Sequence, residues 1–152
     1  DSVLNGLKAI RPESACIVAV HDGARPLVHP DEIAAVIAKA KETGAAVLTA
    51  PVTDTIKVVA DGEITQTIDR NTLRRALTPQ CFRYKILSRA YELAGELSSA
   101  TDESYLVEKA GFPVAYVDGS AMNIKITNAE DLALAEFLSS NFVFEKEKLK
   151  QT

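Results

Sequence analysis

The sequence lacks the features that would place it in a membrane, outside the cell or on a nucleic acid. No apolar run approaches the roughly 20 residues that a membrane-spanning helix needs. The N-terminal residues do not form a basic region followed by an apolar stretch, as a secretory signal does. The 17 Lys and Arg are outnumbered by 21 Asp and Glu and form no strongly basic run, which argues against a nucleic-acid polymer as partner. We therefore expect a cytoplasmic protein that binds neither a membrane nor a nucleic acid.

Cysteine, histidine and glycine-rich motifs are scarce as well. Cys16 and Cys81 are the only cysteines, and because they form no Cys-x-x-Cys pair they indicate a reducing compartment and no zinc site. The only histidines, His21 and His29, flank one loop, so the Ser/His/Asp or Cys/His set of an acyl-transfer enzyme is missing. Neither GxxxxGKS/T nor GxGxxG occurs, so a nucleotide would find no glycine-rich triphosphate cradle in this chain.

What the sequence does contain suits one globular domain. Of its 152 residues, 47% are hydrophobic and 25% are charged, which allows a core that needs neither disulfides nor a structural metal. The net charge of −4 still permits one small phosphorylated ligand, held by a few basic side chains.

Apolar periodicity predicts an alternation of helices and strands. Helices are expected over 2–10, 30–43, 83–97 and 101–110 and from 128 onward, strands over 16–20, 46–50 and 114–117, and a short extended piece over 123–126. Strand, helix and strand in succession usually form a right-handed crossover, so the first two strands are predicted to pair in parallel.

Polar side chains at the predicted helix starts indicate the caps. Ser2 and Thr101 are expected N-caps, and Asn128 is expected to cap the last helix. The apolar spacing of that helix predicts an inner face that includes Leu134, Phe137 and Leu138.

A hairpin interrupts the α/β alternation. Thr55–Val59 and Glu63–Ile68 are β-prone runs on either side of an Asp61-Gly62 turn. The runs are too polar to bury both faces, and an isolated two-stranded hairpin is only marginally stable in water. From the residues alone, the hairpin is expected to pack either against its own domain or against a partner chain, and the two alternatives stay open.

The start of the chain is unusual for this class. The chain begins at Asp1 and runs almost at once into a helix, whereas a doubly wound fold normally opens with a strand. We therefore expect either that a first strand has been removed or that the chain is a piece of a longer one.

Charged and hydroxyl-bearing residues gather in short stretches beside the predicted strand ends and the hairpin. These stretches are His21–Arg25, Asp54-Thr55, Asp69-Arg70, 101–103 and 123–127. Each has an ordinary explanation, such as an Asp–Arg pair within one loop, a helix cap or a solvent-facing lysine. However, ligands of open α/β sheets bind beside the carboxyl ends of strands, which is where these residues fall.

Taken together, the stretches predict a site for a phosphorylated polyol. They supply cations for a phosphate (Arg25, Arg70, Lys125), a carboxylate for Mg²⁺ or a hydroxyl (Asp22), and hydroxyl groups (Thr55, Thr78, Thr101). Arginine suits this role because its planar guanidinium matches the oxygens of a phosphate.

Six motifs in a fixed order resemble those of one enzyme family. They are His21-Asp22-Gly23-Ala24-Arg25-Pro26, Pro51–Lys57, Thr67–Arg70, Leu77-Thr78-Pro79-Gln80, Thr101-Asp102-Glu103 and Asn123–Thr127. Each motif is weak alone, but the ordered set covers nearly the whole chain except its last charged residues. The set closely resembles the 2-C-methyl-D-erythritol 4-phosphate cytidylyltransferases of non-mevalonate isoprenoid biosynthesis.

The resemblance implies a fold and a reaction. The fold is a Rossmann-like α/β nucleotidyltransferase, here incomplete because its first strand is missing, with the hairpin (about 52–70) as a dimerisation arm. The domain would span 1–142 and be followed by a charged tail over 143–152. The reaction converts CTP and methylerythritol phosphate into CDP-methylerythritol and pyrophosphate with Mg²⁺, and the arm would reach the site of a second subunit in a homodimer.

The resemblance also implies roles for individual residues. The polyol phosphate would be held by Asp22, Arg25, Thr55, Arg70, Thr101 and Lys125, with Thr78 nearby, and the cytidine would contact Ser2 and Ala24. Arg70 and Lys125 would hold the attacking phosphate near the α-phosphorus of CTP. Asp22 would orient the substrate or bind Mg²⁺, so these three are the predicted catalytic residues.

One departure from the family limits this reading. The family begins with a strand and a glycine-rich loop that cradles the triphosphate, and this region, with a later segment, supplies the main catalytic lysine. Neither has a counterpart before Asp1. We therefore expect the chain to be the C-terminal part of such an enzyme and to be inactive alone. A ribitol-5-phosphate cytidylyltransferase and a non-catalytic dimerising fragment are the alternatives.

Overall fold

The computed structural model of the chain describes residues 2–11, 17–94 and 102–143, which fold around one four-stranded sheet. The sheet has the order β1 (Ile17–Val20), β5 (Arg74–Arg83), β2 (Ala45–Pro51) and β6 (Ala115–Asp118). Strand β5 runs antiparallel to both of its neighbours, and β2 runs parallel to β6.

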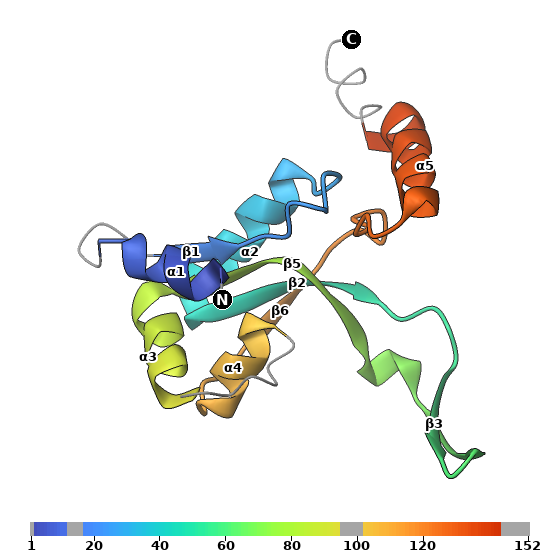
Figure 1. Ribbon diagram of the computed structural model, residues 1–152, viewed down its shortest axis with the longest axis horizontal. Coiled ribbons are helices and arrows are strands. Elements are labelled where there is room, and N and C mark those ends of the chain that lie inside the picture. The colour runs from blue at the N-terminus through green and yellow to red at the C-terminus, as the bar shows by residue number, and fades with distance from the viewer. Residues whose placement is uncertain (1, 12–16, 95–101, 144–152) are drawn as a thin grey trace.

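Helices cover both faces of this sheet (Figure 1). Helix α2 (Pro30–Thr43) packs on one face, and α1 (Ser2–Ala9), α3 (Tyr84–Ala94) and α4 (Glu103–Lys109) pack on the other. Because successive strand residues point to opposite faces, Cys81 joins the core beneath α2 while Phe82 joins the core beneath α3 and α4. The predicted α/β class is therefore confirmed, as is the burial of Cys81, which raises the pKa of its thiol to about 11.

The predicted parallel pair of the first two strands is wrong. Strands β1 and β2 run in the same direction, but β5 lies between them and is hydrogen-bonded to both. The sequence analysis missed β5 because Pro79 lies inside it, and proline is rare in a central strand. Here a register shift between Val47 and Thr49 of β2 accommodates Leu77–Pro79 as an irregularity of the ladder.

The helix starts follow local capping rules, with two corrections. Ser2 is the first residue within α1 rather than its N-cap. Helix α2 begins after His29 with a capping box that includes Glu32. The N-cap of α4 is Asp102, whose carboxylate accepts from the Tyr105 amide, rather than the predicted Thr101, which lies outside the described residues. Asn128 caps α5 (Ala129–Leu138) as predicted.

Helix α5 does not bury the face that the spacing predicts. Within this chain, Leu134 is 47% and Phe137 57% exposed, Leu138 is half-buried, and only Ala135 of the helix is buried. The helix lies apart from the sheet (Figure 1) and continues into a short π-helical turn, η2 (Ser139–Val143). The predicted charged tail lies outside the described residues from 144 onward, as do Cys16 and 95–97. The predicted extended piece over 123–126 belongs to no strand.

The predicted hairpin forms an arm that projects from the body (Figure 1). Strands β3 (Ile56–Ala60) and β4 (Glu63–Ile68) make a separate antiparallel sheet, and the tight turn places Asp61 and Gly62 at positive φ. A short 3-10 turn, η1 (Arg70–Thr72), leads from the arm back to β5. All of β3 is exposed, so the arm has no hydrophobic core of its own.

None of the helices that the structure describes combines the length and the apolar character that a bilayer crossing requires.

We predict that Gly44→Ala destabilises the fold. Gly44 ends α2 with φ +98°, a conformation that L residues rarely adopt, and an added Cβ would approach Ile86 Cδ1 to 2.6 Å. The side chain of Ile86 can move, so the backbone strain dominates, and we expect a loss of about 1–2 kcal/mol in the free energy of unfolding, measured by urea titration.

Gly6→Ala is the matched control for this prediction. Gly6 lies in α1, where an added Cβ has no neighbour within 4 Å, so alanine should stabilise the helix by about 0.5–1 kcal/mol. Equal effects of the two substitutions would contradict the role of the Gly44 backbone.

Candidate functional site

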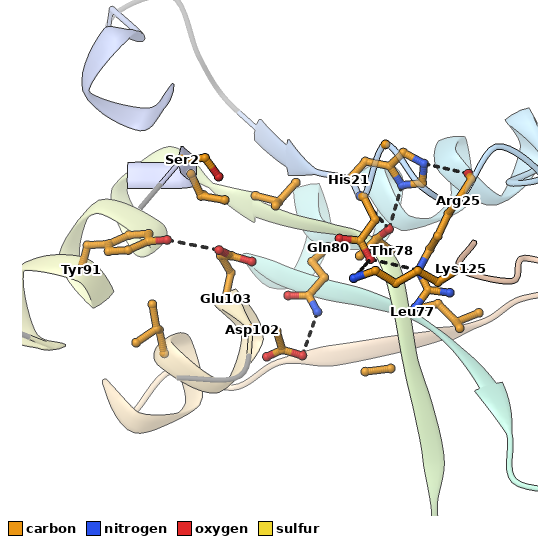
Figure 2. A pocket seen from close by; sticks show the side chains of 16 residues that line it. Ser2, His21, Arg25, Leu77, Thr78, Gln80, Tyr91, Asp102, Glu103 and Lys125 are labelled. Carbon is orange, nitrogen blue, oxygen red and sulfur yellow. Dashed lines mark hydrogen bonds and ion pairs between the residues drawn. The ribbon is translucent and has the colours of Figure 1, made fainter. Parts of the chain in front are cut away.

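A cavity of about 650 Å³ lies at one end of the sheet (Figure 2). Six separate parts of the chain line it: the start of α1, the end of β1 with the loop after it, the middle of β5, Tyr91 of α3, the start of α4 and the 123–127 loop. These parts include most of the stretches that the sequence analysis singled out.

A carboxylate shared by two cations lies at one end of the cavity. Asp22 Oδ2 is 3.2 Å from Arg25 Nε and 3.2 Å from Lys125 Nζ. The ordinary reading, in which Asp22 pairs with the arginine of its own loop, is therefore correct, and Lys125 joins the same pair. The cluster keeps one positive charge in excess, which suits an anionic ligand.

The cations also change the acidity of Asp22. Burial alone would raise its pKa, but hydrogen bonds from Lys125 and Arg25, together with their charges, outweigh burial and hold the pKa below the ordinary 3.8. Asp22 is thus ionised throughout the neutral range and binds both cations.

Thr78 and His21 form the wall beside this cluster. Thr78 Oγ1 accepts from the Asp22 amide at 3.1 Å and lies 2.9 Å from His21 Nδ1, while His21 Nε2 lies 3.2 Å from the Arg25 carbonyl. A carbonyl oxygen can only accept, so this arrangement assigns the proton of a neutral His21 to Nε2 and makes Thr78 the donor to Nδ1. The chain of contacts fixes the loop after β1 on β5.

Asn123 joins the loop that carries Lys125 to the same framework. Its side chain is 1% exposed, its Nδ2 donates to the Thr78 carbonyl at 3.0 Å, and its own carbonyl accepts from Arg25 Nη1 at 2.8 Å. Its Oδ1 is buried and, within the described part of the chain, has no hydrogen-bond partner. Asn123 therefore holds Arg25 through its backbone carbonyl and anchors the loop that carries Lys125 through its side chain.

The opposite end of the cavity is acidic and aromatic. Tyr91 of α3 donates to Glu103 Oε1 at 3.2 Å, and burial together with that carboxylate raises the pKa of the tyrosine. Gln80 Nε2 donates to Asp102 Oδ2 at 3.0 Å, and Gln80 Oε1 accepts from the Ser104 amide at 2.9 Å, so β5 fixes the start of α4.

The structure places the predicted site residues in two groups. Ser2, Asp22, Arg25, Thr78 and Lys125 line the cavity, whereas Ala24 does not line it and its carbonyl accepts from the Ile126 amide at 2.8 Å.

The remaining predicted residues lie elsewhere. Thr55 and Arg70 are exposed on the arm and do not line the cavity, and Arg70 Nη1 donates to the Thr53 carbonyl at 2.6 Å. Thr101 lies outside the described residues, although its neighbour Asp102 lines the cavity.

Gln80 and Tyr91 are lining residues that the sequence analysis did not single out individually. Gln80 was quoted only as part of a motif, and Tyr91 was not singled out at all. Gln80, a polar residue directly before the apolar pair Cys81-Phe82, carried a readable signal of a buried polar contact. Tyr91 carried none, because an aromatic residue on an amphipathic helix is ordinarily part of the core.

The cavity does not form a complete metal site. Among residues 2–11, 17–94 and 102–143, no three His, Cys, Asp or Glu side chains converge as ligands would. The Asp22 carboxylate is already compensated by Arg25 and Lys125, so its surroundings do not favour Mg²⁺ as a further partner. The assignment of Asp22 as a metal ligand remains a prediction.

Comparison with known proteins gives one consistent family. Residues 1–141 match the family model described as "IspD: 2-C-methyl-D-erythritol 4-phosphate cytidylyltransferase". The enzyme of that name from Pelotomaculum thermopropionicum is 49% identical over 138 residues, and that from Syntrophotalea carbinolica is 47% identical over 137 residues. The matches cover 90% of this chain but only 58% and 59% of those relatives.

Solved structures that resemble this chain belong to the same family. The synthase from Anaerococcus prevotii has a TM-score of 0.84 at 32% identity, with 92% of this chain and 65% of that one covered. The cytidylyltransferase from Thermus thermophilus has a TM-score of 0.80 at 38% identity, with 91% and 68% covered.

We predict that Lys125→Met raises the pKa of Asp22, because the largest of the influences that lower it comes from Lys125. A carboxyl-carbon NMR titration measures this directly. Lys41→Met, an exposed lysine of α2, is the control and should leave the pKa of Asp22 unchanged.

The same change has a consequence for stability. A carboxyl whose folded pKa is depressed adds stability above its unfolded pKa, and that stability is lost as the pH falls through the folded pKa. In Lys125→Met, the free energy of unfolding should therefore depend less on pH between the folded and the unfolded pKa of Asp22. An unaltered Asp22 titration in this variant would contradict the shared ion pair.

Proposed function

The chain belongs to the 2-C-methyl-D-erythritol 4-phosphate cytidylyltransferase family, and on that premise we propose that the protein transfers a cytidylyl group from CTP to methylerythritol phosphate. The chain spans about 58% of the length of these relatives, so the reaction is proposed for the whole protein that contains it. The observation that carries the proposal is the Asp22–Arg25–Lys125 cluster at one end of the cavity.

The cluster supports a phosphorylated sugar alcohol as the acceptor. Arg25 and Lys125 supply the charge for a phosphate, and Asp22 supplies an acceptor for hydroxyl groups. Thr78 adds a hydroxyl on the same wall. These groups are already held in place by Asn123 and β5, so binding costs little reorganisation.

In this proposal, the chemistry requires positioning and charge neutralisation rather than a covalent nucleophile. An oxygen of the polyol phosphate attacks the α-phosphorus of CTP in line, a new P–O bond forms, and the bond to the β-phosphate oxygen breaks with release of pyrophosphate. Lys125 and, from the arm, Arg70 hold the attacking phosphate near that phosphorus. Asp22 orients the acceptor.

The nucleotide is proposed to bind toward the other end of the cavity. Ser2 and Val3 line that end together with Tyr91 and Glu103. A cytosine base presents hydrogen-bond donors and acceptors on its edge, which suits the Ser2 hydroxyl. Ala24, whose carbonyl accepts a hydrogen bond from the Ile126 amide, is proposed to contact the nucleotide as well.

Mg²⁺ enters the proposal as the cation that neutralises the triphosphate. It prefers oxygen ligands and is commonly held by one or two carboxylates and the substrate phosphates. Because Asp22 is paired with two cations, we assign no step to a metal on this carboxylate.

We also propose that the protein is a homodimer in which each arm completes the partner's cavity. Thr55 and Arg70 lie away from the cavity of their own chain. Val59 is 67% and Ile64 64% exposed on the arm, and apolar side chains at this exposure favour a second protein surface. Cytoplasmic location belongs to the same proposal, since CTP is made and used there.

The acceptor specificity can be tested with the protein expressed from its own gene. We expect pyrophosphate release from CTP to require methylerythritol phosphate and to be far slower with ribitol 5-phosphate. Equal rates would favour the ribitol alternative. A concentration-dependent dimer that binds neither CTP nor acceptor would instead favour a non-catalytic assembly module.

In the same assay, Lys125→Ala should lower kcat/KM for the polyol phosphate by about 10- to 100-fold, as expected for one charge-assisted contact. Lys41→Ala is the control and should behave as the unmodified protein. Unchanged kinetics in Lys125→Ala would refute the assignment of the phosphate to this cluster.

The dimeric site can be tested by mixing two variants of lowered activity. If the arm acts in the partner, a mixed dimer of Arg70→Ala and Lys125→Ala has one site that retains both groups and one that lacks both. We therefore expect activity to return on subunit exchange. If both groups acted within one chain, every site would lack one of them and mixing would restore nothing.

Arg70→Ala mixed with Thr55→Ala provides the matched control. Both changes lie on the arm, so each site of the mixed dimer still lacks one group, and we expect no recovery. Recovery in this control would mean that subunit mixing itself raises activity.

A further inference from the structure

The arm joins the body at a single pair of residues. Pro51 ends β2 where the chain leaves the sheet, and Arg74 begins β5 where the chain returns, and the two face each other in the ladder. Beyond this pair the chain forms no part of the four-stranded sheet until the hairpin has been completed. The direction of the arm therefore depends on what holds this base.

The side chain of Arg74 ties this base to β6, which is not part of the arm. Its Nε donates to Asp118 Oδ1 at 3.0 Å, and its guanidinium lies 5.2 Å from the centre of the Tyr116 ring. Asp118 and Tyr116 are two residues apart on β6 and so share one face of the sheet. Since β2 lies between β5 and β6, the arginine reaches across the end of a strand.

The same guanidinium binds the turn that leads out of the arm. Arg74 Nη1 donates to the Leu73 carbonyl at 2.9 Å and to the Asn71 carbonyl at 3.4 Å. Asn71 lies in η1 beside Arg70. One planar group therefore contacts β6 on one side and the η1 turn on the other.

We propose that Arg74 is a positioning residue that fixes the direction in which the arm leaves the sheet. An arm that is attached through one residue pair can rotate about that pair. The planar guanidinium of Arg74 contacts β6 on one side and η1 on the other, and therefore opposes this rotation. The presentation of Thr55 and Arg70 to a partner subunit then follows from Arg74. That last consequence rests on the proposed function, whereas the fixing of the arm does not.

The distance from the arm to the body tests the proposal directly. Spin labels are attached to Lys41→Cys on α2 and Glu63→Cys on β4, both exposed positions, in a Cys16→Ser background with the buried Cys81 retained. Dilution into unlabelled protein restricts the measured pairs to one chain. We expect Arg74→Ala to broaden the distance distribution, because the arm then samples several directions.

Two further variants separate positioning from general damage. Arg75→Ala changes the next residue, an exposed arginine of β5, and should leave the distribution unchanged. Arg74→Glu should broaden it, and adding Asp118→Arg should narrow it again, because the reversed pair restores the ion pair to β6. An unaltered distribution in Arg74→Ala, or equal broadening in Arg75→Ala, would overturn the proposal.

A kinetic readout links the arm to the site. We expect Arg74→Ala to raise KM for the polyol phosphate about two- to fivefold, the range for one partly exposed ion pair, with KM for CTP unchanged. An equal rise in both KM values would contradict a role confined to the arm. If no cytidylyl transfer occurs at all, the proposed function fails, and the distance distributions still decide the role of Arg74.

Discussion

The candidate site depends on one carboxylate that holds two cations together. Arg25 and Lys125 would repel each other at this separation, and the charge of Asp22 between them makes their approach favourable. The residues are a hundred positions apart along the chain, so this contact also closes the 123–127 loop onto the loop after β1. The cluster keeps a net positive charge, while Asp22 offsets most of the repulsion between the two cations. A phosphate can add to such a cluster without displacing Asp22.

The cluster in turn depends on the irregular part of β5. Thr78 supports Asp22 and His21 through its hydroxyl, and its carbonyl accepts from the buried Asn123. A regular central strand would commit that carbonyl to the ladder, whereas the register shift opposite β2 leaves it available to a side chain. The departure from regular geometry therefore serves the site rather than the sheet.

The sequence predicted those parts of the fold that are determined locally. The start of α2 was readable from Pro30 and the acidic first turn, and the hairpin from Asp61-Gly62, because these signals act over a few residues. Strand pairing is not local, and the insertion of β5 between β1 and β2 could not be read from the order of the elements. The exposed face of α5 failed for a related reason: apolar spacing identifies a face that needs cover but not what covers it.

In the site, too, local features could be predicted from the sequence and contacts between distant residues could not. No spacing rule connects Asp22 to Lys125, and only their residue types beside predicted strand ends, together with the ordered set of motifs, suggested that they share a ligand. Gln80 and Tyr91 remained unassigned because their contacts, to Asp102 and Glu103, arise from tertiary packing.

The separation of the binding groups into a cavity and an arm has a thermodynamic consequence. The cavity groups are organised within one chain, so they are present at any protein concentration. In the proposed dimer, the arm groups, Thr55 and Arg70, reach an acceptor only when two subunits are assembled, so acceptor binding and subunit association are linked. A ligand that contacts both groups must strengthen the dimer by the same factor by which the dimer strengthens its binding. In that proposed dimer, contacts with the second subunit would stabilise the exposed arm, which has no hydrophobic core of its own.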